Sequence, residues 1–317
     1  MILDGGLGVE LERRGFAPAT SLWSGEAIFT CPDLLVDVHR AYLDAGAEVI
    51  ATATYQLSHA ALRRLGCDDA AIDRIFARGV ALARAAIASQ RARTGASSEQ
   101  LVAGSLGPFG ATLGPGGEYS RSPQIEFDAL YAFHAERLRS MACARPDVFL
   151  FETIPSRAEG LVIAQAALDL GLRNVWMSFT CADDTRTCAR DRLADVAAEL
   201  DAFACVDVIG VNCTAPDAIA PLVRAMRGAT DKPIFVCPNL GRQGESAGQA
   251  LSGEAPEAAF IAGVPGWMAL GVTHIGGCCG VGPETIRALA RVVAETDARC
   301  DHRFRKSNPA TAGRYCE

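Results

Sequence analysis

Clusters of basic residues and long apolar runs are missing from this sequence. The net formal charge is -7, and no run of Lys and Arg occurs before the last few residues. Nucleic-acid binding depends on such clusters, so we expect no nucleic-acid partner. No apolar stretch approaches the roughly 18 residues of a membrane span. The chain reaches Asp4 at once, without the basic and apolar segments of a signal peptide, so we expect a cytoplasmic protein and no membrane partner.

The twelve cysteines lack the setting of a disulfide framework. Disulfide-rich chains are short and secreted because they cannot build a large core, whereas this chain has 317 residues and is 50% hydrophobic. We therefore expect most of the thiols to be reduced. Seven of them have no metal-like spacing and are interpreted as packing or surface residues, namely Cys31, Cys67, Cys143, Cys188, Cys205, Cys300 and Cys316.

Short apolar runs alternate with helical patterns along most of the chain. Residues 32–45 are typical of such a helix, because Pro32 suits a first helical position and Gly46 suits the stop. The alternation, without long linkers, predicts a single-domain (β/α)8 barrel over residues 1–300 and a loose polar tail over 301–317. The expected parallel strands are Ile2–Leu3, Glu48–Ala53, Leu101–Ser105, Val148–Phe151, Val175–Phe179, Val206–Val211, Pro233–Val236 and Thr273–Ile275.

The residues that follow these runs are polar or contain cysteine. In a (β/α)8 barrel the loops after the strands build the active site, so these residues should converge on one rim. The segments concerned are Asp4–Gly6, Thr54–Gln56, Gly107–Gly110, Glu152–Thr153, Asn212–Cys213, Pro238–Asn239 and Gly276–Gly280.

Three cysteines of this rim are candidates for a metal site. Cys278 and Cys279 are adjacent, which strains a disulfide between them, and the flanking glycines let both thiols turn toward one centre. Cys213 can approach them across the barrel mouth. Three sulfur ligands favour zinc and leave a fourth position for a substrate. From the residues alone, a redox-active pair of neighbouring thiols and simple packing thiols remain alternatives.

Nine motifs follow one another through the predicted barrel, namely Asp4–Gly5, Leu11–Gly15, Ser21–Ser24, Thr54–Gln56, Gly104–Pro108, Glu152–Thr153, Gly210–Cys213, Pro238–Asn239 and Gly276–Cys279. Together they resemble the homocysteine S-methyltransferase family, and within it the branch that uses S-methylmethionine as the methyl donor. The resemblance implies a (β/α)8 barrel and a Zn²⁺ ion held by Cys213, Cys278 and Cys279.

The resemblance also implies which residues bind the substrates. Asp4 and Glu152 would bind the amino group of homocysteine, and Gly5 and Thr54 would lie near its carboxylate. For each polar candidate a structural reading stays open, such as a turn for Asp4, a salt bridge for Glu152 and bonds to loop backbone for Thr54. Two further candidates are likewise undecided. Asn212 either contacts substrate or bonds loop backbone, and Trp23 either stacks on a donor cation or covers the rim.

The resulting functional hypothesis is zinc-dependent methyl transfer from S-methylmethionine, or also S-adenosylmethionine, to homocysteine, which forms methionine. One alternative keeps the acceptor but takes the methyl group from betaine or a methyl-corrinoid protein. Another, of a different class, is a non-catalytic zinc or redox thiol sensor. The sequence leaves the oligomeric state open.

Overall fold

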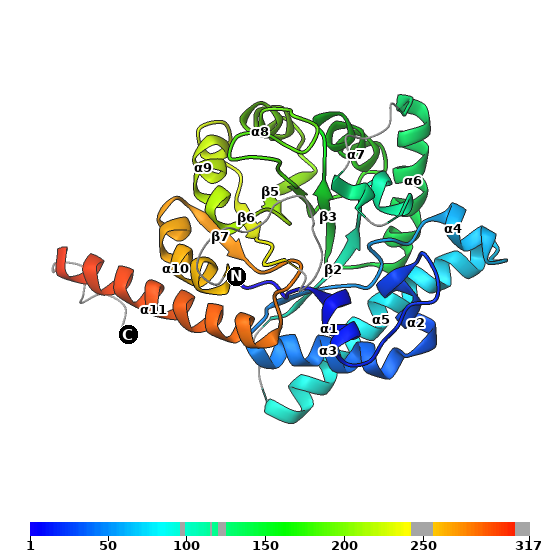
Figure 1. The fold of residues 1–317 in the computed structure, drawn as a ribbon, viewed down its shortest axis with the longest axis horizontal. Helices are drawn as coiled ribbons and strands as arrows, with labels where there is room; N and C mark the ends of the chain where they lie inside the picture. Colours follow the sequence, from blue (N-terminus) through cyan, green and yellow to red (C-terminus); the bar gives the residue numbers. More distant parts are fainter. Residues whose placement is uncertain (96–98, 115, 120–124, 242–255, 308–317) are drawn as a thin grey trace.

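Seven parallel strands lie side by side in one curled sheet, in sequence order, in the computed structural model of the chain (Figure 1). The structure describes residues 1–95, 99–114, 116–119, 125–241 and 256–307. The strands are β1 (Val49–Ala51), β2 (Leu101–Leu106), β3 (Val148–Ile154), β4 (Val175–Phe179), β5 (Val206–Asn212), β6 (Ile234–Cys237) and β7 (Val272–Ile275). All seven coincide with predicted runs, and the fold is TIM-barrel-like.

The first predicted strand is not a regular strand. Ile2 and Leu3 form two isolated parallel bridges, to Ile275 of β7 and to Val49 of β1. Directly after them the chain turns into helix α1 (Leu7–Arg13), so no ladder extends beyond these two residues. The prediction of a complete eight-stranded barrel is therefore corrected to seven strands, with a bridging segment where the eighth was expected.

Helices connect successive strands and cover the outside of the sheet (Figure 1). The predicted helix over residues 32–45 is confirmed as α3, with Pro32 in its first turn and Gly46 in the left-handed conformation at its end. The remaining helices are α2 (Ala27–Thr30), α4 (His59–Arg64), α5 (Asp69–Thr94), α6 (Phe127–Ala144), α7 (Arg157–Asp169), α8 (Leu193–Asp201), α9 (Pro216–Arg227), α10 (Pro256–Ala269), α11 (Pro283–Ser307) and three 3₁₀ turns, η1 (Trp23–Glu26), η2 (Phe109–Thr112) and η3 (Gly117–Tyr119).

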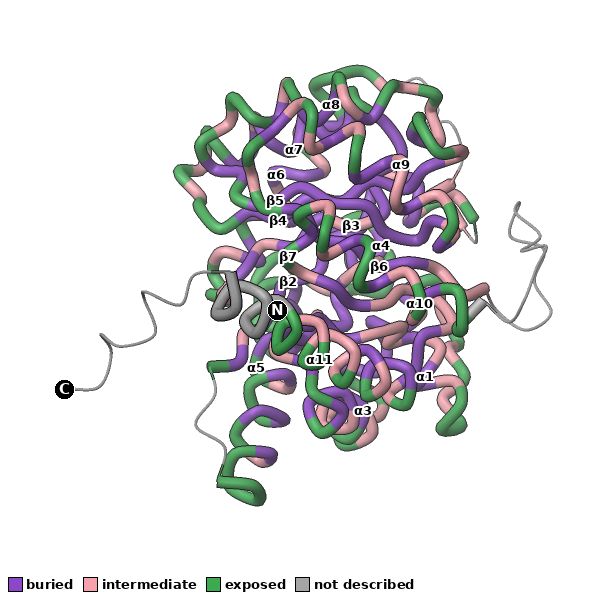
Figure 2. Tube along the Cα trace, turned by 90° about the vertical axis from the view of Figure 1, so that its left-hand side faces the viewer, coloured by how far each residue is buried: buried purple, intermediate pink, exposed green. Residues whose placement is uncertain are grey.

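The core has two parts. Figure 2 shows the buried segments in the interior of the molecule and the exposed segments at its periphery. The larger part fills the space between sheet and helices. The smaller part fills the inside of the curled sheet, where Trp176 lies edge-on to His274 with ring centroids 4.9 Å apart. This inner plug leaves the carboxyl ends of the strands open for a site.

Helix α11 continues to Ser307, past the domain boundary expected at residue 300. The rest of the expected tail lies outside the described residues.

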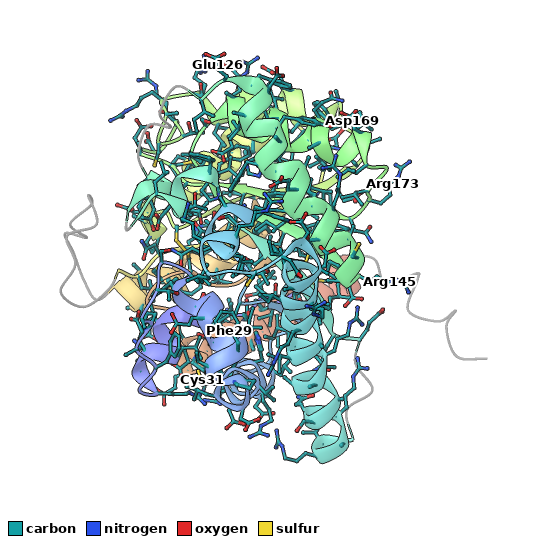
Figure 3. All side chains as sticks on the ribbon, turned by 90° about the vertical axis from the view of Figure 1, so that its right-hand side faces the viewer. Phe29, Cys31, Glu126, Arg145, Asp169 and Arg173 are labelled. Carbon is teal, nitrogen blue, oxygen red and sulfur yellow. A yellow bond between two sulfur atoms is a disulfide. The ribbon has the colours of Figure 1, made fainter. Side chains whose placement is uncertain are left out.

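Cys31, which was interpreted as a packing or surface residue, lies in the outer helical layer near the exposed Phe29 (Figure 3). Within the described part of the chain, no helix is long and apolar enough to cross a membrane.

Candidate active site

A cavity of about 650 Å³ lies at the carboxyl ends of the strands. Its wall is built from loops that follow different strands, as the rim argument predicts. All predicted site residues line it except Thr54, namely Asp4, Gly5, Trp23, Glu152, Asn212, Cys213, Cys278 and Cys279.

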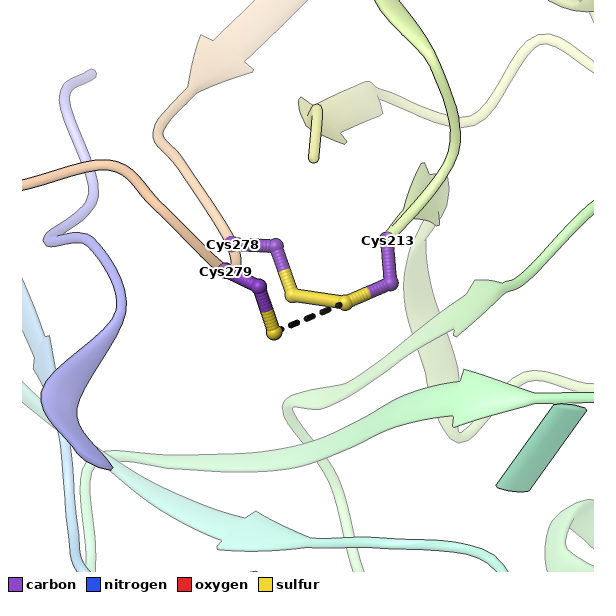
Figure 4. A group of neighbouring side chains, drawn as sticks. All are labelled: Cys213, Cys278 and Cys279. Carbon is purple, nitrogen blue, oxygen red and sulfur yellow. Dashed lines mark hydrogen bonds between the residues drawn. A yellow bond between two sulfur atoms is a disulfide. The ribbon is translucent and has the colours of Figure 1, made fainter. Parts of the chain in front are cut away.

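The three candidate cysteines converge at this cavity (Figure 4). Cys213 directly follows β5, Cys278 and Cys279 follow β7, and their sulfur atoms all lie within 4.8 Å of one another. Cys213 and Cys278 are joined by a disulfide, and the Sγ atom of Cys279 is 3.8 Å from that of Cys213. Most of the described cysteines are reduced, as expected, but Cys213 and Cys278 are not. The oxidised pair also differs from the neighbouring pair considered from the sequence.

The sulfur atoms fit a zinc site once the disulfide is reduced to thiolates. Tetrahedral zinc with zinc–sulfur bonds of about 2.3 Å holds its sulfur ligands about 3.8 Å apart. The separation between Cys213 and Cys279 already equals this value at 3.8 Å. Three soft ligands would leave one position for a substrate sulfur.

Asn212 holds the surroundings of this cluster in place. Its buried side-chain oxygen accepts hydrogen bonds from the Thr153 backbone N–H at 2.7 Å and the Ser178 hydroxyl at 2.8 Å. Its amide nitrogen donates to the Thr153 hydroxyl at 2.8 Å and lies 3.9 Å from the sulfur of Cys278. Thr153 has a positive φ of 64°, which these bonds stabilise. The amide of Asn212 is thus engaged with protein groups although the residue lines the cavity.

Two carboxyl groups enter the cavity beside the cysteines. Asp4 is buried, and its Oδ2 accepts a hydrogen bond from the Ala51 backbone N–H at 2.8 Å. Burial raises the pKa of Asp4 well above its usual range, and the nearby Glu152 raises it further. Burial also raises the pKa of Glu152, although the Ser105 hydroxyl donates a hydrogen bond to its carboxylate. A cation bound between the two acids would stabilise both carboxylates and so lower both pKa values.

The charge of the cavity wall has one sign. Asp4, Glu118 and Glu152 line it, whereas no Lys or Arg occurs among its lining residues in the described part of the chain. Such a surface attracts cationic groups and repels anionic ones. The arrangement suits an ammonium or sulfonium ligand.

The structure distinguishes Gly5 from Thr54, which were predicted to lie near the same substrate carboxylate. Gly5 lines the cavity, and a Cβ atom there would lie 2.3 Å from the Val281 carbonyl oxygen, so only glycine fits. Thr54 is buried and donates a hydrogen bond to the Ser105 carbonyl at 2.7 Å. Thr52 lines the cavity instead.

Trp23 lines part of the cavity, and its ring is held against helix α1. Its indole N–H donates a hydrogen bond to Glu12 at 2.7 Å. The ring lies so close to Gly8 that a Cβ atom there would be 2.3 Å from it. Helix α1 therefore fixes the orientation of this aromatic wall.

Three further cavity residues were not singled out as site residues from the sequence. Ser105 lies at the end of β2, where its hydroxyl donates a hydrogen bond to Glu152, and Cys237 is the last residue of β6. Burial raises the pKa of Cys237 well above its usual range, and Glu152 and Asp4 add to the effect. The hydroxyl of Tyr119 is hydrogen-bonded to Cys279, and burial raises the pKa of Tyr119. Ser105 ends one predicted apolar run and Cys237 directly follows another, so the sequence could have predicted both residues to lie at the rim.

Comparison with known proteins agrees with this geometry. The family model described as homocysteine S-methyltransferase matches residues 1–293. Homocysteine S-methyltransferase 4 of Zea mays is 36% identical over 307 residues, covering 93% of this chain and 90% of its own, and homocysteine S-methyltransferase of Escherichia coli is 33% identical over 290 residues, covering 91% and 94%. The crystal structure of the homocysteine methyltransferase MmuM from Escherichia coli in its metallated form superimposes with a TM-score of 0.82 at 33% identity, covering 92% of this chain and 95% of that one. The protein therefore belongs to the homocysteine S-methyltransferase family and is a methyltransferase.

Proposed function

We propose that the protein transfers a methyl group from S-methylmethionine to the sulfur of homocysteine, with a zinc ion held by Cys213, Cys278 and Cys279. S-Adenosylmethionine is a second sulfonium donor that the same site could accept. The observation that carries the proposal is the convergence of three sulfur atoms and two buried acids on one cavity.

The acids suit the amino group of homocysteine. Asp4 and Glu152 are both buried, and each has a raised pKa, so an ammonium group that binds between them offsets unfavourable negative charge. Gly5 and Thr52 line the same cavity as the two acids. Asn212 bonds Thr153, which follows Glu152 in β3, and its amide lies against Cys278, so it fixes the acid relative to the three sulfur atoms.

Zinc, when bound, supplies positive charge that lowers the pKa of the homocysteine thiol, so that the thiolate forms at neutral pH. The protein then has to hold the acceptor sulfur, the methyl carbon and the donor sulfur in line. A thioether leaves without taking up a proton, so neither Asp4 nor Glu152 has to act as a general acid. The raised pKa values of the two acids are therefore assigned to binding of the substrate ammonium group and not to proton transfer.

The donor assignment rests on charge. A sulfonium is a cation, and the described wall carries acids but no basic side chain. The neighbouring crystal structures bear the name homocysteine methyltransferase, one in a metallated and one in an oxidised form, which parallels the metal-compatible and disulfide-bonded arrangements of the three cysteines here. Betaine is also cationic and is kept as a test compound. A thiol sensor would have no use for Asp4 and Glu152 in the same cavity.

The test is a donor panel on the reduced, zinc-loaded protein. Homocysteine with a carbon-13 backbone is the common acceptor, and the donors are S-methylmethionine, S-adenosylmethionine, betaine and a methyl-corrinoid protein. We expect carbon-13 methionine, detected by mass spectrometry, with the two sulfonium donors and fastest with S-methylmethionine. Product from betaine or the corrinoid alone would overturn the donor assignment, and no product from any donor would overturn the function.

A further inference from the structure

A cluster of charged side chains is buried outside the cavity, between helices α6 and α7 and the sheet. This buried charge cluster consists of His134 and Arg137 of α6 and Glu159 of α7, each no more than 1% exposed. Burying charges is costly unless they are paired and hydrogen-bonded, and apolar side chains in such positions are often at least as stabilising. Stability alone therefore explains the cluster poorly. Its contacts indicate a role in positioning the loops after β1 and β2.

Arg137 ties together the two loops that follow β1 and β2. One guanidinium nitrogen donates to the Gly107 carbonyl at 2.6 Å, and the other donates to the Tyr55 carbonyl at 2.7 Å. The Gly107 N–H also donates to the Tyr55 carbonyl at 2.9 Å. A planar guanidinium can bridge two carbonyl oxygens in this way, whereas the single ammonium of lysine lacks that fork.

Glu159 fixes the next part of the loop after β2. Its carboxylate accepts the Phe109 backbone N–H at 2.6 Å and is bonded to the His134 ring at 2.9 Å. Phe109 is the first residue of η2, so this bond sets where η2 begins.

The position of η2 is passed on to η3 and so to the cavity. Gly110 of η2 and Gly117 of η3 are in backbone contact, because a Cβ atom on either would lie within 2.3 Å of the carbonyl oxygen of the other. The turn η3 ends at Tyr119, which is hydrogen-bonded to Cys279. The buried charge cluster is thereby linked to the space beside the sulfur atoms through η2, the backbone contact between Gly110 and Gly117, and Tyr119.

We propose that Arg137 and Glu159 are positioning residues for the methyl donor. They act on a part of the cavity that we call the donor wall, formed by Tyr55, Gln56, Ala111, Thr112, Glu118 and Tyr119, all of which line the cavity. The acids that suit homocysteine and the three cysteines come from other strand ends. This inference rests on the proposed function for its kinetic consequence, but its structural consequence can be measured without turnover.

The test compares Arg137→Met, Arg137→Lys and Glu159→Ala with the control Arg84→Met. Arg84 lies on the surface, where it pairs with Asp147, so its loss removes an arginine without touching the donor wall. Hydrogen exchange of the segment 106–119 is measured in the absence of substrates. The KM for S-methylmethionine, the affinity for homocysteine and the zinc content are then measured on the same samples.

We expect faster exchange of this segment in Arg137→Met and Glu159→Ala, with a rise of about tenfold or more in the donor KM. Homocysteine affinity and zinc content should stay at the wild-type level. Arg137→Lys should fall between wild type and Arg137→Met, and Arg84→Met should match wild type.

Unchanged exchange and unchanged donor KM in a folded Arg137→Met protein would overturn the proposal. So would equal losses of donor and homocysteine affinity, because these would indicate a general structural role. If Arg137→Met does not fold, Arg137→Lys and Glu159→Ala decide by the same readouts. A wild-type protein that transfers no methyl group would refute the proposed function, and the exchange data would then still decide whether Arg137 and Glu159 order this loop.

Discussion

Replacing Glu152 by Gln should stabilise the empty protein and weaken its binding of homocysteine. The two effects have one cause, because Glu152 is a buried acid near another acid, and no Lys or Arg is among the described residues that line the cavity. Gln keeps the size and can still accept a hydrogen bond from Ser105, but it carries no charge.

The stability effect depends on pH, and its sign follows from the pKa. Folding raises the pKa of Glu152 above its ordinary value of 4.5. The carboxyl group therefore binds a proton more tightly in the folded state, and the wild-type free energy of unfolding should fall as pH rises from the ordinary pKa to the raised one. Each unit of pKa difference is worth about 1.4 kcal/mol above that window. Glu152→Gln should remove this loss, and it should also lower the pKa of Asp4.

The binding effect has the opposite sign. Removing one member of a buried, charge-assisted pair costs about 2–4 kcal/mol, which corresponds to a roughly 30- to 700-fold weaker affinity. Calorimetry of homocysteine binding to the reduced, zinc-loaded protein measures this loss, and urea unfolding at pH 5 and pH 8 measures the stability.

A matched control is Glu199→Gln, because Glu199 is exposed and paired with Arg157. It should change neither quantity. If Glu152→Gln lowered the stability at pH 8, or bound homocysteine as tightly as wild type, the assignment of Glu152 to the ammonium group would be wrong.

Two further substitutions test the architecture of the site. Asn212→Ala leaves the buried Thr153 N–H without its partner, so it should lower the free energy of unfolding by about 2–3 kcal/mol in a urea titration; an unchanged midpoint would contradict the role given to this amide. Gly5→Ala places a methyl group 2.3 Å from the Val281 oxygen, so it should lower the free energy of unfolding by about 1–3 kcal/mol. The control Gly266→Ala, in helix α10, meets nothing within 4 Å and should leave the free energy of unfolding unchanged or raise it by up to about 1 kcal/mol. Equal melting temperatures for the two variants would refute the close approach at Gly5.

Most of the fold could be predicted because buried parallel strands are short apolar runs between helices, and all seven observed strands match such runs. The error lies at Ile2 and Leu3. An apolar pair looks the same in the sequence whether it begins a ladder or makes two single bridges. The difference depends on the turn into α1 at Gly5 and Gly6, which only the three-dimensional contacts show.

The site could be predicted in part for a related reason. The order of strand ends indicated which segments meet, and Cys213, Cys278 and Cys279 do meet. The disulfide could not be read from the sequence because it depends on the distance between two segments and on oxidation. The sequence also could not show that Thr52, and not Thr54, lines the cavity, because the end of a short strand does not fix which of two nearby residues reaches it.

The buried charge cluster was not predicted at all. Arg137 and Glu159 lie in helical patterns, where charged residues usually face solvent. Their burial follows from the loop after β2, whose Gly107 carbonyl accepts a hydrogen bond from Arg137 and whose Phe109 N–H donates one to Glu159. A residue whose partners are backbone groups of distant loops leaves no pattern in its own segment.

The proposed methyl transfer requires one zinc ion bound by three cysteine sulfur atoms, Cys213, Cys278 and Cys279. The measurement that tests it most directly is zinc content, by atomic emission, together with methyl transfer in the reduced wild type, Cys278→Ala and the control Cys188→Ala, whose cysteine lies outside the group of three. We predict about one zinc per chain with activity in the wild type and the control, and loss of both in Cys278→Ala. Undiminished methyl transfer in zinc-free wild type, or full zinc content in Cys278→Ala, would contradict zinc binding by these three cysteines.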